Sequence, residues 1–342
     1  MKKPVLILLL MLLLFLSSCS STGPLWVTDT AAAYPDSEWL YFVAIAGDRQ
    51  SAEDAALTGL ARSFNANVQQ TTYDNQRFAQ IIANPDRKRR IEASSSSEET
   101  VRESVISTNV SGLIGVQMDS WTASNGKVYA NARMNRQECA ARYAAMIREN
   151  ERLIEQLQEE AQRYPATFDA VEILNFAFNV AQVTDNFHRV LTRLDSSATE
   201  RPLRYGNADM VKAFAQNAAR SIAITVKVEG DVGGRIASAL GGYFTRLGYS
   251  TNSDGASAYT LSAVFNIEDY NAGHPTRQFV QYLLTYSLTN TAGFNKDFDS
   301  DSDRESGLTR EQARARAIDA AVTSIGSTGF AAKFGAYLAS LL

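Results

Sequence analysis

The first 22 residues constrain this chain more than any other feature of its sequence. Lys2 and Lys3 precede an almost unbroken apolar run from Pro4 to Leu16. This run is shorter than the roughly 20 residues that a helix needs to cross a bilayer, and its length fits the apolar centre of a signal peptide. We therefore expect residues 1–18 to be a signal peptide that precedes the folded protein.

The end of this segment predicts how the protein is held at a membrane. Leu16-Ser17-Ser18-Cys19 places an aliphatic residue and two small residues before a cysteine, and this pattern resembles the bacterial lipobox. The resemblance implies cleavage between Ser18 and Cys19, a diacylglyceryl thioether on Cys19, and a new amino terminus acylated with a fatty acid such as palmitate. Two or more acyl chains hold a protein stably at a membrane. Residues 19–23 would then be the lipidated cysteine and a short tether.

The residue after the cysteine favours the outer membrane. Ser20 is not the Asp that retains such lipoproteins at the inner membrane of enteric bacteria. The resemblance therefore implies a lipid anchor in the outer membrane, with the protein facing the periplasm or the cell surface. No later stretch approaches 18 consecutive apolar residues, so we expect no transmembrane helix. The alternative is an ordinary secretory signal followed by a chance cysteine.

Composition and charge limit the class of protein. The 342 residues are 45% hydrophobic and 20% charged, which is typical of a globular protein, and the length favours two domains. Without residues 1–18 the chain has 31 Lys and Arg against 37 Asp and Glu, a balance of −6. An acidic balance argues against general nucleic-acid binding. Cys139 is the only cysteine besides Cys19, so no intramolecular disulfide forms once Cys19 carries lipid.

Residues 24–136 predict an α+β domain. The sequence favours strands at Trp39–Ile45, Val110–Trp121 and Lys127–Met134, a helix that begins near Ser51, and a type I′ hairpin at Asn125-Gly126.

A polar insert interrupts this domain around residues 80–105. It contains the basic run Arg87-Lys88-Arg89-Arg90 and the serine run Ser94–Ser97. The basic run is open to two interpretations, a contact for phosphate or anionic lipid and a solvated loop. We favour the loop, because four charges without an aromatic platform are a weak signal.

Several short motifs in this domain resemble the Lpp-twenty family of bacterial lipoproteins, over about a third of the chain. The motifs are Pro24-x-Trp26, Tyr34-Pro35-Asp36, the strand ending at Gly47, the helix with Ala52, Asp54-Ala55 and Leu60-Ala61, and the late Val128-Tyr129. A related module begins the flagellar assembly protein T family. The resemblance implies a small α+β domain in the cell envelope and brings no catalytic residues. The polar insert departs from a compact module of this kind.

Residues 137–196 predict an antiparallel helical hairpin. Apolar residues follow alternating spacings of three and four from Tyr143 to Tyr164 and again from Ile173 to Leu194, with Pro165 between them. Asn150 lies on the first seam, where it would either set the register or face solvent. The hairpin would either cover neighbouring sheets or project toward a partner, and apolar residues off the second seam favour the first alternative.

Residues 205–342 predict a second domain with the order β-α-β-β-α. Alternating apolar residues mark strands at 222–228, 259–267 and 280–288, while Thr309 and Gln312 form a capping box before an Ala-rich helix. This order loosely resembles the periplasmic TolB N-terminal, curli-secretion and penicillin-binding-protein-activator domains. The fold class expected for the whole chain is therefore α+β, with two small helix-on-sheet domains joined by the hairpin.

Two segments of the second domain resemble ligand loops without matching them. Gly230-Asp231-Val232-Gly233-Gly234-Arg235 lies between a strand and a helix, but it fits neither dinucleotide-binding nor phosphate-loop spacing. The acidic run from Asp297 to Glu305 lacks the Gly and the closing Glu of an EF-hand. We expect a strand-to-helix turn in the first segment and a solvated hairpin or loop in the second.

The remaining candidates are isolated side chains. His188 and His274 have no His or Cys at the spacing of a zinc site. Cys139 begins a predicted helix, where a thiol pKa can fall, although a buried structural thiol is commoner. The sequence therefore predicts no catalytic residue, no metal and no cofactor, and Cys19 is the one modification site.

These observations favour a non-catalytic, lipid-anchored protein that binds or organises other envelope proteins. Its expected partners are the membrane, through Cys19, and an envelope protein. Two alternatives stay open: a carrier of a small hydrophobic ligand, and a hydrolase without a recognisable motif.

Overall fold

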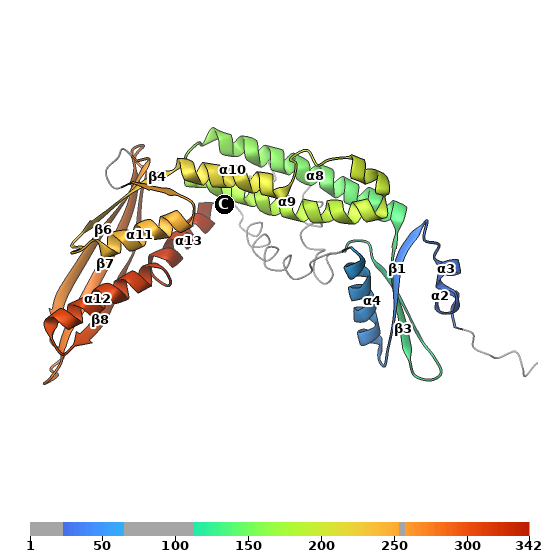
Figure 1. Cartoon of the computed structure of the whole chain (residues 1–342), viewed down its shortest axis with the longest axis horizontal. Coiled ribbons are helices and arrows are strands. Elements are labelled where there is room, and N and C mark those ends of the chain that lie inside the picture. Colours follow the sequence, from blue (N-terminus) through green and yellow to red (C-terminus); the bar gives the residue numbers. More distant parts are fainter. Residues whose placement is uncertain (1–22, 65–112, 253–256, 342) are drawn as a thin grey trace, which may run out of the picture. The chain divides into compact units, whose positions relative to one another are not determined.

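The computed structural model describes residues 23–64, 113–252 and 257–341, which form two compact units (Figure 1). The first unit contains residues 23–64, 113–148 and 186–201, and the second contains the rest. Each unit packs helices on a sheet, so the predicted α+β class is confirmed. The predicted signal peptide, the predicted lipid site Cys19 and the basic run Arg87–Arg90 lie outside the described residues.

The first unit is built on a three-stranded antiparallel sheet. Its strands β1 (Trp39–Ala46), β2 (Gln117–Thr122) and β3 (Val128–Asn135) lie in the order β1-β3-β2. Helix α4 (Arg49–Ser63) packs on one face, where Gly59 leaves room for the ring of Phe42. The short helices α2 (Leu25–Thr28) and α3 (Thr30–Ala33) lie on the opposite side of the sheet from α4 (Figure 1).

Helix α4 begins earlier than the sequence predicted. Its N-cap is Asp48 rather than Ser51, and the Asp48 carboxylate accepts a hydrogen bond of 2.9 Å from the Ser51 amide. That bond lowers the pKa of Asp48 below its ordinary value. Asp satisfies the free amides of a first helical turn as well as Ser does, so Ser51 lies inside the helix.

The strand predicted at Val110–Trp121 is wrong over residues 113–116, while residues 110–112 lie outside the described part of the chain. Within the described part of that range the strand starts at Gln117. Gly115 has a φ of +84°, which breaks an extended backbone. Ile114 is buried instead, and its amide donates a 2.7 Å hydrogen bond to the Tyr143 hydroxyl.

The hairpin at Asn125-Gly126 is present, but its turn is not type I′. Gly126 has a φ of +78°, while Asn125 is not among the described residues with positive φ. The Gly126 amide donates to the Ala123 carbonyl at 2.9 Å, and Ala123 in turn pairs with Lys127. A type I turn followed by a left-handed glycine is the usual form of a longer hairpin loop.

The two predicted long helices are α8 (Arg136–Arg163) and α9 (Phe168–Leu194), and both contribute to each unit. In the first unit the rings of Tyr143 and Phe187 meet edge to face at 5.5 Å. In the second, buried Asn150 donates a 3.0 Å hydrogen bond to the Thr184 hydroxyl. Asn150 therefore pairs across the seam and does not face solvent.

The second unit contains a mixed five-stranded sheet. Its order is β5-β4-β6-β7-β8, with β4 parallel to β5 and β6 and the remaining pairs antiparallel. The strands are β4 (Ala223–Glu229), β5 (Ser250–Asn252), β6 (Tyr259–Tyr270), β7 (Gln278–Asn290) and β8 (Asn295–Gly307). Helices α11 (Arg235–Arg246), α12 (Arg310–Ile325) and α13 (Phe330–Leu341) cover its apolar face. Phe168 of α9 joins this core, with its ring 5.4 Å from that of Phe334.

Three elements of this unit were not predicted from the sequence: α10 (Ala208–Ser221), β5 and β8. The acidic run, expected as a hairpin or loop, is the edge strand β8. Acidic residues are poor strand formers, but on an edge strand their side chains reach water while Phe298 is buried. Charges on an edge also discourage pairing with another chain.

Candidate functional site

The segment that follows the predicted lipid site is folded against the first sheet. We call residues 23–34, which include α2 and α3, the N-terminal strap. Trp26 of the strap is only 8% exposed. A Cβ atom on Gly23 would lie 3.0 Å from the ring of Trp121 in β2, so the first described residue touches the sheet. The strap therefore begins in contact with the fold four residues after Cys19.

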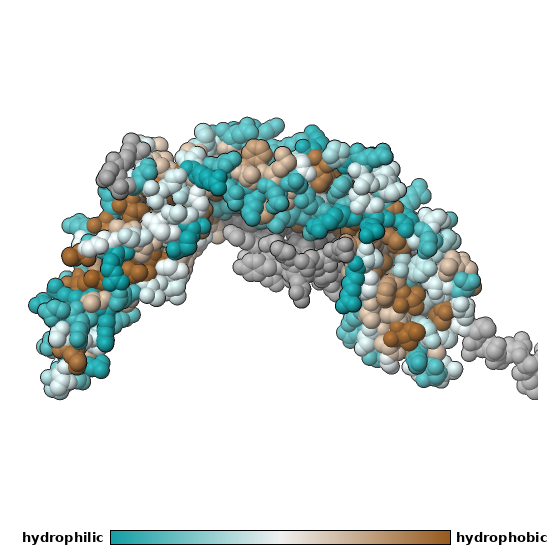
Figure 2. All heavy atoms as spheres, viewed as in Figure 1, coloured by the Kyte–Doolittle hydropathy of each residue, from teal (hydrophilic) through white to brown (hydrophobic). Residues whose placement is uncertain are grey.

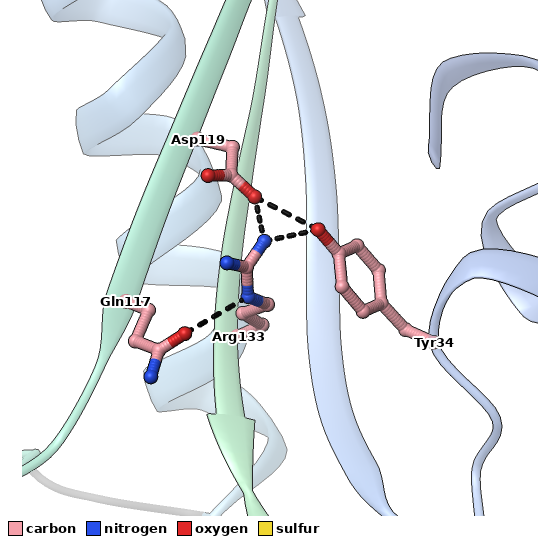
Figure 3. A network of polar contacts seen from close by, with 4 residues as sticks. All are labelled: Tyr34, Gln117, Asp119 and Arg133. Carbon is pink, nitrogen blue, oxygen red and sulfur yellow. Dashed lines mark hydrogen bonds and ion pairs between the residues drawn. The ribbon is translucent and has the colours of Figure 1, made fainter. Parts of the chain in front are cut away.

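The other end of the strap is held by a cluster of four side chains, which we call the Arg133 cluster (Figure 3). The Tyr34 hydroxyl donates a 2.9 Å hydrogen bond to Oδ2 of Asp119. Arg133 pairs with the same carboxylate and donates to the Tyr34 hydroxyl. Its Nε donates to the Gln117 side chain at 3.1 Å. Strands β2 and β3 thus supply a charged clamp for a tyrosine of the strap.

Aromatic rings complete the Arg133 cluster. The Arg133 guanidinium carbon lies 4.6 Å from the centre of the Tyr34 ring and 5.4 Å from that of Trp39. The Tyr34 and Trp39 rings meet edge to face at 5.5 Å. A guanidinium over aromatic faces adds a cation–π attraction to its ion pair. Because Asp119 matches the charge of Arg133, and Nε and Nη1 of Arg133 both bond to neighbouring side chains, this geometry holds the strap in place.

Asn131 lies on the same sheet face, next to Asp119 in the strand register. Its side chain is fully buried, and neither amide atom has a hydrogen-bond partner in the described part of the chain. A buried amide without a partner costs free energy. The fold tolerates this cost at the centre of β3.

The loop from Gly230 to Arg235 is a strand-to-helix turn, as the sequence predicted. Three glycines have positive φ, at Gly230, Gly233 and Gly234. Asp231 lies just before α11, and its carboxylate accepts a 2.8 Å hydrogen bond from the Ala237 amide in the first turn of that helix. A carboxylate in that position takes the place that an anion would need.

The acidic run of β8 is used for packing. The Asp301 carboxylate accepts a 2.6 Å hydrogen bond from the Tyr286 hydroxyl and pairs with Lys333 of α13. Burial, with the hydrogen bond to Asp301 as the second cause, raises the pKa of Tyr286. Across residues 23–64, 113–252 and 257–341, no three His, Cys, Asp or Glu side chains are placed to hold a metal ion.

The isolated candidates all have structural contacts. His188 Nε2 lies 3.2 Å from the Arg201 carbonyl oxygen, and His274 Nδ1 lies 3.3 Å from the Thr276 amide. Cys139 is buried, with its Sγ 3.7 Å from the Gly115 carbonyl oxygen. Burial raises the pKa of this thiol, so the lowered pKa expected of a reactive thiol is absent.

Sequence reasoning missed the Arg133 cluster. The alternation of β3 places Tyr129, Asn131 and Arg133 on one face, and that signal was available. Their pairing with Asp119 and Gln117 depends on the strand register, which in turn depends on the hairpin loop. Contact with Tyr34 depends on the path of the strap, for which no pattern exists.

No family model matches this chain, and no curated protein matches it. Fifteen chains of solved structures match it, among them three of low similarity. A secreted protein of Helicobacter pylori is 14% identical with a TM-score of 0.42, covering 85% of this chain and 95% of that one. A minor lipoprotein of Acinetobacter baumannii is 11% identical with a TM-score of 0.25, covering 31% and 88%.

The third is the rare lipoprotein B of Shewanella oneidensis, 12% identical with a TM-score of 0.21, covering 31% of this chain and 95% of that one. Similarity at this level transfers no function, so the resemblance to the Lpp-twenty family stays a prediction. Within the described ranges, no helix is both long and apolar enough to cross a bilayer.

Proposed function

We propose that this chain is a lipoprotein, anchored in the bacterial outer membrane through Cys19, that binds or organises other envelope proteins and catalyses no reaction. The observation that carries the proposal is the join between the predicted anchor and the fold. The lipobox ends at Cys19, and the strap touches Trp121 at Gly23 and is clamped again at Tyr34. An anchor joined so closely to a folded domain holds that domain at the membrane surface.

Binding is favoured over catalysis by what the candidate side chains do. Cys139, His188 and Asp231 each make a contact that stabilises the fold. The Arg133 cluster satisfies its own charge, because Arg133 and Asp119 pair with each other. These side chains therefore act as structural groups, which is consistent with a protein that binds other proteins and catalyses no reaction.

In-cell cross-linking followed by affinity purification tests the proposal. Wild type is compared with Cys19→Ala, which removes the lipid acceptor, and with Ser21→Ala, which leaves the lipobox intact. We expect a discrete envelope protein with wild type and Ser21→Ala, and its loss with Cys19→Ala.

Recovery of no protein with any form would contradict the binding role. Co-purification of a small apolar molecule would favour a ligand carrier instead. Labelling of the native protein by an active-site serine or cysteine probe would favour a hydrolase.

A further inference from the structure

One end of the first sheet carries a row of large side chains on the face opposite α4. Ile45 of β1 pairs with Tyr129 of β3, and Tyr129 pairs with Trp121 of β2. The Trp121 and Tyr129 rings lie 5.6 Å apart. This row is next to the hairpin loop that joins β2 to β3. Leu25 of the strap follows Gly23 by two residues, and Gly23 rests on the Trp121 ring. We group Leu25 with these three residues and call the four the tether-end patch.

The patch is exposed although it is apolar and aromatic. Ile45 is 55% exposed and Leu25 is 57% exposed, while Trp121 and Tyr129 are half-buried. Figure 2 shows apolar side chains at the surface of the first unit over β1 and β3. Lys127, at the end of the hairpin loop, adds an exposed positive charge beside the row. Exposed apolar side chains that gather in this way mark a surface that meets a partner.

The chain itself indicates which partner lies closest. Gly23 rests on Trp121, and Cys19 precedes Gly23 by four residues. Four residues span at most about 14 Å when fully extended. A lipid on Cys19 therefore brings Trp121, and the row that contains it, to within about that distance of the bilayer surface.

We propose that the tether-end patch rests on the phospholipid surface, with Trp121 and Tyr129 at the level of the headgroups and Leu25 and Ile45 against the acyl boundary. Trp and Tyr favour this level because each joins an apolar body to a polar tip. Lys127 would face anionic headgroups. This inference rests on the proposed lipid anchor, and it adds which face of the first unit meets the membrane.

Site-directed fluorescence at two matched serines tests the orientation. Ser124 is in the hairpin loop beside the patch, and Ser37 is at the opposite end of β1. Both are exposed. Full-length lipidated Ser124→Cys and Ser37→Cys are labelled with an environment-sensitive fluorophore, and the parent protein with buried Cys139 serves as the labelling control. The proteins are placed on vesicles of phosphatidylethanolamine and phosphatidylglycerol that contain a spin-labelled lipid quencher.

We expect quenching at position 124 to exceed quenching at position 37 at least twofold. In the double variant Leu25→Ser, Ile45→Ser, quenching at position 124 should fall by at least half. Both substituted side chains are already exposed, so the fold should persist, and circular dichroism checks this.

Flotation of the vesicles distinguishes failure of the lipid anchor from failure of the proposed orientation. Chains that fail to float with the vesicles would contradict the lipid anchor and the orientation together. Chains that float but are quenched equally at both positions would overturn the orientation alone, and so would a double variant with unchanged quenching. A protein cross-linked to position 124 in cells, without quenching by lipid, would assign the patch to a protein partner.

Discussion

The Tyr34 hydroxyl donates a 2.9 Å hydrogen bond to Asp119, although the two residues are 85 positions apart in the chain. This bond fixes the end of the N-terminal strap to β2, and Arg133 of β3 joins the same contact from its own strand. The strap leads directly from the predicted lipid site. If Cys19 carries the proposed lipid, this attachment determines how the first unit is held relative to that anchor.

Replacing Tyr34 with Phe should loosen the strap while leaving its ring in place. The change removes a hydrogen bond to a charged group, so we expect the free energy of unfolding to fall by about 1.5–3 kcal/mol. Urea denaturation measures this loss, and hydrogen exchange of residues 24–34 should speed up. Tyr41→Phe is the matched control, because its hydroxyl makes no hydrogen bond to another described residue. Equal stability of the two variants would argue against the clamp.

Asn131 should be replaceable with a gain in stability. Both of its amide atoms are buried without a partner in the described residues, so Asn131→Val removes a desolvation cost of about 1–3 kcal/mol. Val also suits a strand. Asn150→Ala is the contrasting change: it breaks the bond to Thr184 and should lower the free energy of unfolding by about 1 kcal/mol. A loss of stability in Asn131→Val would indicate that the amide has a polar partner in the folded protein.

Gly230→Ala should destabilise the second unit more than Gly233→Ala does. Both glycines have positive φ, at +81° and +97°, which costs a residue with a Cβ roughly 1–2 kcal/mol. At Gly230 the added Cβ would also collide with the Phe265 carbonyl oxygen, whereas it would meet nothing within 4 Å at Gly233. Thermal unfolding of the two variants measures the difference. Equal melting temperatures would show that the backbone between β4 and α11 shifts freely.

Raising the pH from about 10 to about 12 should lower the free energy of unfolding of the second unit. Burial, and then the neighbouring Asp303 and Asp301, raise the pKa of Tyr282 to about 12, against about 10 in an unfolded chain. The neutral form is therefore favoured in the folded state. The resulting stability is complete below pH 10 and is lost as the pH rises toward 12.

Urea midpoints between pH 9 and pH 11.5 test this behaviour, since they should fall with pH in wild type. The fall should be shallower in Tyr282→Phe. Tyr286 has a raised pKa in the same core, so some dependence should persist in that variant. Midpoints that stay constant to pH 11.5 would mean that folding does not raise the pKa of these tyrosines.

Cys139 should be unreactive in the folded protein. Its side chain is 5% exposed and burial raises the pKa of its thiol, while thiolate is the reactive form. An aromatic disulfide reagent at pH 8 should label it only after denaturant is added. Rapid labelling of the native protein would contradict the structural role and reopen a chemical one.

Patterns within single elements predicted much of this fold. Strands β4, β6 and β7 alternate apolar and polar residues because one face of their sheet is covered by helices. Thr309 and Gln312 form the capping pair expected at the start of α12, with a 3.2 Å bond from the Gln312 amide to the Thr309 hydroxyl. Such signals are local, so a sequence displays them directly.

The elements that sequence reasoning missed depend on distant partners. Strand β8 is held by pairing with β7, despite its acidic residues. In the same way, the Arg133 cluster depends on the register of three strands and on the path of the strap. The site predicted most directly, Cys19, follows from a linear signal that needs no fold.

Mass spectrometry of the amino-terminal peptide from the membrane-extracted protein is the sharpest test of the lipid anchor on Cys19. We expect a peptide that begins at Cys19 and carries a diacylglyceryl thioether and an amide-linked acyl chain, and we expect neither modification in Cys19→Ala. A peptide with a free Cys19 thiol, or one that begins elsewhere, would contradict the lipid anchor on which the proposed function depends.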